Sequence, residues 1–220
     1  MNQLTNAYVF PYYNDVDFDS QLRVSNVGSD STTINVYLGS NPNPIDTYTL
    51  GAGTALRKNY AGMRDGPMKV TSSATNILTT IRAYVNNVSY SELMGYPVNQ
   101  LTSEYWYPVY DDVDLDSQLR VSNVGSGTTT ITVYAGGSQI DSYSLGTGQA
   151  TRVNYASKNT GPLHVVSSSQ PILSTIRLWL ASGPSYYEIM GLPGTQLTTQ
   201  YWFPWYNSLV MDPEVRIAMP

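Results

Sequence analysis

The chain has 220 residues, no cysteine and a single histidine, His164. These scarcities exclude a zinc site built from thiolates and imidazoles, and a Cys/His or Ser/His/Asp nucleophile system repeated along the chain. Charged side chains are also scarce, at 12% of the residues, and the formal net charge is −5. Because a negatively charged protein repels phosphate backbones, we expect no nucleic-acid partner.

Long apolar runs are lacking as well. No stretch approaches the roughly 20 residues that a membrane-spanning helix needs. Residues 1–4, Met-Asn-Gln-Leu, do not have the basic region followed by an apolar region that marks a signal peptide. We therefore expect a soluble mature chain without membrane insertion, with any export signal outside these residues.

Threonine, serine, asparagine, glycine and 19 tyrosines are abundant instead, and such residues suit pleated surfaces and tight turns. The triplet Gln-Leu-Thr begins at residues 3, 100 and 196, and the segment Asp19–Gly28 returns unchanged as Asp116–Gly125. A repeat of this length indicates successive structural units of one kind. The sequence predicts repeat 1 in residues 1–99, repeat 2 in residues 100–195 and a partial repeat in residues 196–220.

Apolar and polar side chains alternate within each copy. The segments 77–85 and 172–180 have a period of about two residues, which is typical of a strand with one buried face. Turns rich in glycine and proline, such as 65–67, separate these segments. About seven short strands in roughly 100 residues predict an all-β chain of two tandem immunoglobulin-like β-sandwich repeats with a C-terminal partial repeat.

Several longer motifs recur along the chain. They are Gln-Leu-Thr-x-x-Tyr-Trp-[Tyr/Phe]-Pro at 100–108 and 196–204, Asp-Ser-Gln-Leu-Arg-Val-Ser-Asn-Val-Gly at 19–28 and 116–125, and Glu-[Leu/Ile]-Met-Gly-x-Pro at 92–97 and 188–193. Together they resemble the tandem repeats near the C-termini of large secreted or surface proteins of filamentous bacteria such as Chloroflexota. The resemblance implies stalk or attachment modules outside the cell rather than catalytic domains, and the lack of cysteine permits such export.

An acidic run follows the first aromatic segment of each full copy. The candidate calcium ligands in these runs are Asp15, Asp17, Asp19, Asp112, Asp114 and Asp116. Calcium accepts about six to eight oxygen ligands, and alternating carboxylates can converge on it. The alternative is a solvated turn in which Asp19 and Asp116 cap backbone amides, and the lack of a glycine-containing loop of EF-hand spacing favours this turn. We expect no other cofactor.

Aromatic residues cluster at the start of each copy. The cluster residues in repeat 2 and the partial repeat are Tyr105, Trp106, Tyr107, Tyr201, Trp202, Phe203 and Trp205. Flat rings on an exposed sheet can hold the apolar faces of sugars, which makes polysaccharide a candidate partner. A strand with aromatic residues on both faces is instead typical of packing, here against the neighbouring repeat, and packing is the interpretation that we favour.

Two arginine–glutamate pairs recur in equivalent places. Arg82 and Glu92 in repeat 1 match Arg177 and Glu188 in repeat 2. Such a pair can serve catalysis, but we expect structural ion pairs that pin the loop between the repeats, because the arginine fork suits a partly buried carboxylate. We therefore expect no catalytic residues and no enzymatic activity.

The chain has three aromatic segments that open a copy, beginning at residues 3, 100 and 196, but only two complete copies. One of these segments is therefore surplus. If each aromatic strand belongs to the copy that it opens, residues 196–220 form an orphan strand pair with exposed rings. If it packs backwards, residues 196–220 complete repeat 2. A surplus strand suits head-to-tail addition to other copies of the chain. The sequence thus predicts an extracellular or cell-surface structural or adhesive module, with a carbohydrate-binding module as the alternative.

Overall fold

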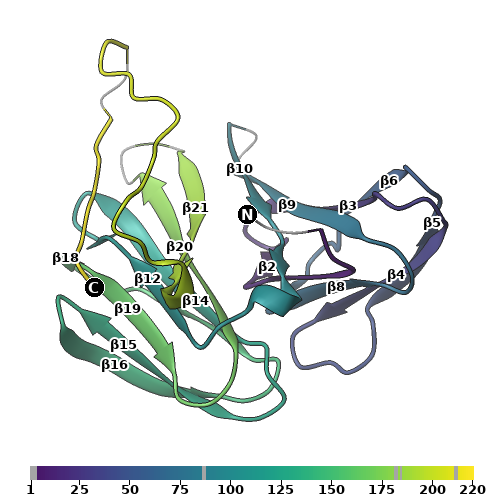
Figure 1. The fold of residues 1–220 in the computed structure, drawn as a ribbon, viewed down its shortest axis with the longest axis horizontal. Helices are drawn as coiled ribbons and strands as arrows, with labels where there is room; N and C mark the ends of the chain where they lie inside the picture. Colours follow the sequence, from purple (N-terminus) through teal and green to yellow (C-terminus); the bar gives the residue numbers. More distant parts are fainter. Residues whose placement is uncertain (1–3, 86–87, 181–182, 184, 211–212) are drawn as a thin grey trace.

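The computed structural model describes residues 4–85, 88–180, 183, 185–210 and 213–220. Strands hold 54% of the described residues and helices 3%, so the expectation of an all-β chain is confirmed. Figure 1 shows repeat 1, in purple to blue, and repeat 2, in teal to green, as two lobes side by side.

The same series of elements occurs in both repeats. In repeat 1 the elements are β1 (Ala7–Phe10), β2 (Tyr13–Asn14), β3 (Asp19–Asn26), β4 (Thr32–Leu38), β5 (Asp46–Leu50), β6 (Ala55–Lys58), β7 (Arg64–Asp65), β8 (Met68–Ser72), β9 (Ile77–Val85), β10 (Ser89–Met94), β11 (Tyr96–Pro97) and the 3-10 helix η1 (Val98–Gln100). In repeat 2 they are β12 (Glu104–Tyr107), β13 (Tyr110–Asp111), β14 (Leu115–Asn123), β15 (Thr129–Ala135), β16 (Ser138–Leu145), β17 (Ala150–Val153), β18 (Asn159–Thr160), β19 (Leu163–Ser167), β20 (Ile172–Leu180), β21 (Tyr186–Met190), β22 (Leu192–Pro193) and the 3-10 helix η2 (Gly194–Gln196).

The strands form antiparallel sheets with the same order in both repeats. Repeat 1 has a five-stranded sheet, β11-β1-β8-β4-β5, and a four-stranded sheet, β10-β9-β3-β6. Repeat 2 has the equivalent sheets β22-β12-β19-β15-β16 and β21-β20-β14-β17. The short pairs β2–β7 and β13–β18 accompany them. The repeat in the sequence is therefore also a repeat in strand topology.

Alternation along the strands decides which side chains are buried. On β3, Leu22 and Val24 are buried, whereas Arg23 and Ser25 face outward. The buried side chains of both sheets form one apolar cluster in repeat 1. Repeat 2 has a corresponding cluster, which also includes Val9 and Tyr96 of repeat 1. The period of two residues in the sequence therefore identifies the core face of β3.

Each aromatic strand pairs within the repeat that it opens. Strand β1 lies between β8 and β11, and Tyr8 lies opposite Pro97. Strand β12 lies in the same way between β19 and β22. This is the first of the two arrangements considered above. The chain consequently enters and leaves each repeat at neighbouring points of one sheet.

The tail, residues 197–220, follows η2 and lies beside repeat 2 (Figure 1). Its described residues contain no strand, which differs from the expected strand pair. The reason is that β12 already occupies the equivalent place in the sheet of repeat 2, so the tail has no partner there. Trp202 is 91% exposed and Trp205 is 78% exposed.

Candidate functional site

The acidic run of repeat 1 forms a tight turn between β2 and β3. Asn14 Oδ1 accepts hydrogen bonds from the backbone amides of Val16 and Asp17, both at 3.1 Å. Asp15 Oδ1 accepts another from the backbone amide of Ser20 at 2.6 Å. Such bonds from short polar side chains to nearby amides fix the path of a turn.

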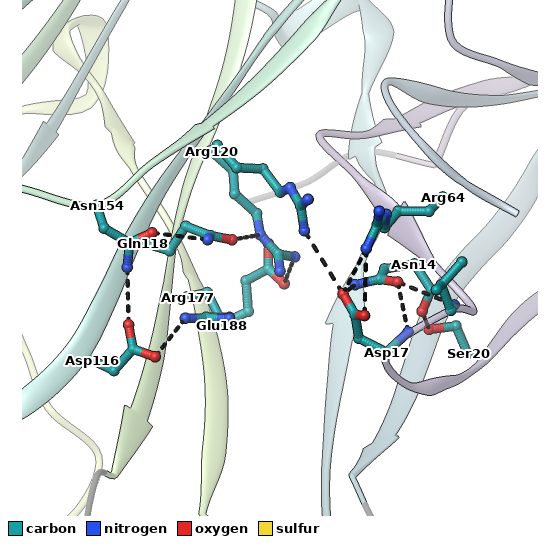
Figure 2. A network of polar contacts seen from close by, with 12 residues as sticks. Asn14, Asp17, Ser20, Arg64, Asp116, Gln118, Arg120, Asn154, Arg177 and Glu188 are labelled. Carbon is teal, nitrogen blue, oxygen red and sulfur yellow. Dashed lines mark hydrogen bonds and ion pairs between the residues drawn. The ribbon is translucent and has the colours of Figure 1, made fainter.

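Asp17 points from this turn toward repeat 2 (Figure 2). Its carboxylate lies 3.3 Å from Arg64 in the same repeat and 3.9 Å from Arg152 in repeat 2. The hydrogen bond from Asn14 and the charges of Arg64 and Arg152 lower the pKa of Asp17, because all three favour the ionised form. The turn therefore presents a negative charge to the neighbouring repeat.

The six candidate calcium ligands are not brought together. Besides the partners named above, Asp19 accepts a hydrogen bond from Asn59, Asp116 accepts one from Asn154, and Asp112 accepts one from the Ser117 amide, whereas Asp114 is exposed. Within the described part of the chain, no three His, Asp or Glu side chains form a group that could hold a metal ion. The run is a capped turn, as in the alternative to calcium, but the expected capping residues were wrong. Asp19 and Asp116 accept from side-chain amides, whereas Asn14, Asp15, Asp111 and Asp112 accept from the backbone amides.

The turn of repeat 1 lies against the outer face of the four-stranded sheet of repeat 2. The Ser122 hydroxyl on β14 donates a hydrogen bond to the backbone oxygen of Pro11 at 2.5 Å. The ring centroid of Tyr12 is 5.4 Å from the guanidinium of Arg120 and 4.8 Å from that of Arg152. Such cation–π contacts are stronger where water is removed around them.

Phe18 supplies the apolar part of this contact. Its ring centroid lies 5.0 Å from that of Tyr186 and 6.1 Å from that of Trp179, both in repeat 2. Phe18 is 8% exposed, and it forms one cluster with Ala83, Val85 and the two aromatic rings. The two repeats therefore share an apolar cluster as well as polar contacts.

A buried ion pair lies beside the apolar cluster. Arg120 Nη1 is 2.9 Å from Glu188 Oε2, and the two side chains are only 3% and 7% exposed; Figure 2 shows them pointing toward one another. Glu188 also accepts hydrogen bonds from Thr175 at 2.6 Å and from the Tyr186 hydroxyl at 2.9 Å. Burial opposes the charge on Arg120, but Glu188 and Tyr186 outweigh it and raise its pKa. Several donors around one carboxylate offset its lost hydration.

A small cavity of about 20 Å³ lies at the contact. Phe18 and Ser91 of repeat 1 line it together with Arg120 and Tyr186 of repeat 2. A space of this size holds about one water molecule. The side chains of the two repeats therefore leave little free space at this point of the contact.

The ion pairs expected in repeat 1 have other partners. Arg82 lies opposite Glu92 in the sheet, but its guanidinium stacks on the ring of Tyr84, 4.2 Å from the centroid. Glu92 instead reaches Arg23 on β3 at 3.1 Å. Strand β9 lies between β10 and β3, so the pair forms across an intervening strand, and the order of residues along one strand does not reveal it.

The same correction applies to repeat 2. Arg177 lies opposite Glu188 in the sheet, but it bonds to Asp116 at 3.0 Å. Glu188 pairs with Arg120. Asp116, a candidate calcium ligand, and Arg177, a candidate partner of Glu188, thus bind each other.

A row of rings crosses the outer face of the five-stranded sheet of repeat 2. Trp106 stacks on His164 with 3.6 Å between ring centroids, and Tyr134 lies 5.9 Å from His164 on the other side. Burial lowers the pKa of His164, although the hydrogen-bonded Glu104 at 3.0 Å opposes this shift. Met219 of the tail helps to line the groove beside this row.

The aromatic clusters named from the sequence divide into two groups. Tyr105 and Tyr107 are buried in the core of repeat 2, at 0% and 2% exposure, whereas Trp106 between them faces outward. The cluster residues of the tail, namely Tyr201, Trp202, Phe203 and Trp205, are all exposed, as is Tyr206 beside them. The packing interpretation therefore describes the first group and not the second.

The sequence did not single out Phe18 as a contact residue, and it placed Tyr12 only within the aromatic segment that opens repeat 1. Both stand where repeat 2 has smaller side chains, Val109 and Leu115. A larger aromatic residue in one copy of an otherwise similar turn is the signal that could have pointed to a contact with the neighbouring repeat.

No family model, curated protein or solved structure matches the chain. In the part of the chain that the structure describes, no helix is long and apolar enough to cross a membrane. The functional conclusion therefore rests on the contact between the repeats and on the exposed aromatic residues.

Proposed function

We propose that this chain is a non-enzymatic structural or adhesive module of a bacterial extracellular or cell-surface protein, in which neighbouring repeats stack into a stiff array. The observation that carries the proposal is the buried Arg120–Glu188 pair, which the turn of repeat 1 covers. Relative motion is the default for tandem domains with small contacts. A charged pair buried by the neighbouring repeat is the mark of a fixed arrangement.

Each repeat is, in this proposal, an immunoglobulin-like β-sandwich. Val36 of the five-stranded sheet and Val24 of the four-stranded sheet belong to one apolar cluster in repeat 1. Val133 and Val121 have the same relation in repeat 2. Two antiparallel sheets that share one core in about 100 residues support this assignment. The extracellular location rests on the resemblance of the repeat motifs and on a cysteine-free composition that suits export.

Thermal unfolding of the full chain, followed by calorimetry, tests the stacking. A stiff array predicts one cooperative transition for both repeats. Phe18→Ala removes the apolar part of the contact, and we expect it to cost about 3 kcal/mol and to separate the transition into two. Leu115→Ala is the matched control at the equivalent place in repeat 2, where the side chain is only partly buried. Two independent transitions in the unmodified chain would contradict the proposal.

For the tail we propose strand addition to another copy of the chain. Residues 201–206 are the counterpart of the aromatic strands β1 and β12, and their apolar rings are exposed. An extended segment of this kind gains backbone hydrogen bonds and buries its rings by joining the edge of another sheet. Head-to-tail addition of this kind produces a fibre.

Carbohydrate binding is the second candidate function, and the row of Trp106, His164 and Tyr134 favours it. Flat rings beside an open groove suit the apolar faces of sugars. Soluble polysaccharides titrated against tryptophan fluorescence test this candidate, with Trp106→Ala as the variant. Saturable binding that this variant abolishes supports a sugar site, and no binding across the panel rejects it.

A further inference from the structure

We propose that the outer face of the four-stranded sheet of repeat 1 docks a second copy of this chain, which contributes the turn 108–115 of its repeat 2. This inference rests on the proposed function, because it names the partner that such a module would bind. We call the outer face formed by Arg23, Arg57, Thr80, Tyr90 and Glu92 the acceptor face of repeat 1. The turn 108–115 is the donor turn of repeat 2.

The acceptor face of repeat 1 has the same chemistry as a face that is covered in repeat 2. Arg23 and Glu92 form the ion pair at 3.1 Å that Arg120 and Glu188 form at 2.9 Å. The first pair is 30% and 34% exposed, but the second is 3% and 7% exposed. The same interaction is therefore open to solvent in one copy and sealed by a neighbour in the other.

Three further matched positions show the same difference. Tyr90 is 60% exposed, whereas its equivalent Tyr186 is 5% exposed. Ser25 is only half-buried, whereas its equivalent Ser122 is fully buried and donates to Pro11. The remaining pair, Thr80 and Thr175, is half-buried and fully buried respectively.

A glycine at the edge of the face shows the contact through the backbone. A Cβ atom added to Gly148 would lie 2.8 Å from the backbone oxygen of Gly39 in repeat 1. At the equivalent Gly53, no atom lies within 4 Å of an added Cβ. The backbone of repeat 1 thus packs against repeat 2 at Gly148, and no described segment packs against repeat 1 at Gly53.

The donor turn shows the opposite difference. Pro11 is buried and Phe18 is 8% exposed in repeat 1, whereas Pro108 is exposed and Leu115 is only half-buried in repeat 2. The donor turn keeps an apolar residue at each of these places. It also keeps Asp114 where repeat 1 has Asp17, the carboxylate that lies 3.9 Å from Arg152.

The charges on the acceptor face and on the exposed part of the donor turn are complementary; Arg216 of the tail binds Asp111 of this turn at 3.3 Å and leaves Asp114 exposed. The acceptor face carries Arg57 at the place of Arg152, so the contact between Asp17 and Arg152 has its counterpart in Asp114 and Arg57. Repeat 2 of one copy and repeat 1 of the next can therefore meet as repeats 1 and 2 meet within one chain. Such a contact uses two different surfaces and leaves both ends open, so it continues from copy to copy.

Association of the full chain, measured by sedimentation equilibrium over a wide concentration range, tests this contact. The gain-of-contact variant Val109→Tyr with Leu115→Phe gives repeat 2 the aromatic residues of the repeat 1 turn. We expect it to associate about tenfold more tightly than the unmodified chain, because each added aromatic contact contributes about 0.5–1.5 kcal/mol. Arg23→Glu in that background should return association to the original level or below, and Lys69→Glu, the same charge change on the other sheet, should not.

Charge exchange adds a second arm. Asp114→Arg and Arg57→Glu should each weaken self-association, and an equal mixture of the two chains should associate again through the reversed pair. The inference is overturned if the aromatic variant stays monomeric, if Arg23→Glu and Lys69→Glu act alike, or if the mixture does not recover. Association that disappears when the tail is deleted also overturns it, because strand addition would then be the cause. If self-association fails these tests but the unmodified chain still unfolds in a single transition, the proposed stacking of the two repeats within one chain remains supported.

Discussion

Arg23 in repeat 1 and Arg120 in repeat 2 occupy equivalent positions. Each forms an ion pair with a glutamate of the same sheet. Their surroundings differ because the turn of repeat 1 covers Arg120 only. An exposed ion pair contributes little to stability, since water competes for both charges. A buried pair is costly to break, because removal of one partner leaves the other charge without water or counter-ion.

The two arginines therefore predict different costs for one substitution. We expect Arg120→Ala to reduce the free energy of unfolding by about 3–5 kcal/mol and Arg23→Ala to reduce it by less than about 1 kcal/mol. Chemical denaturation of both variants at one pH and salt concentration measures the difference. Equal losses would show that the Arg120–Glu188 pair is not sealed from solvent.

At the scale of the element, the contact between the repeats joins a turn to the outer face of a sheet. The tight turn 14–20 is held by its own side-chain oxygens, so Phe18 within it and Tyr12 just before it are displayed without a large loss of conformational entropy. The sheet opposite is fixed by its strand pairing. Two rigid surfaces of this kind give a contact of defined geometry.

Gly148 and Gly53 offer a matched test of this contact. Both have a positive φ, +67° and +65°, so an alanine at either place is strained by roughly 1–2 kcal/mol. Gly148→Ala should cost at least about 1 kcal/mol more, because its Cβ atom meets the backbone of repeat 1. Calorimetry of both variants checks this, and equal costs would argue against a close approach of the repeats at Gly148.

The whole molecule has two equivalent repeats with unequal surroundings and a tail without a sheet. The all-β class and the alternation along β3 could be read from the sequence because they depend on local periodicity. The partners of Glu92 and Glu188 could not, because each lies two strands away in the sheet, with another strand between them. The burial of Arg120 could not either, because it depends on a turn more than 100 residues away in sequence.

Removal of the tail tests how far the two repeats depend on it. We expect a chain that ends after Gln200 to keep its unfolding midpoint within about 2 °C, which corresponds to less than about 1 kcal/mol for a chain of this size. Binding of an apolar fluorescent dye should fall, because Trp202 and Trp205 are removed with their exposed rings. A larger fall of the midpoint would show that the tail completes repeat 2.

The pairing of β1 with β11 has a mechanical consequence. The chain enters a repeat at Tyr8 and leaves it at Pro97, directly across from each other. A force that pulls the two ends apart would act on this short pairing like a zipper, because it loads the hydrogen bonds one after another rather than all together. Under tension the contact between the repeats would then provide the main resistance to extension. Once it breaks, the chain would lengthen in steps as the repeats unfold one at a time.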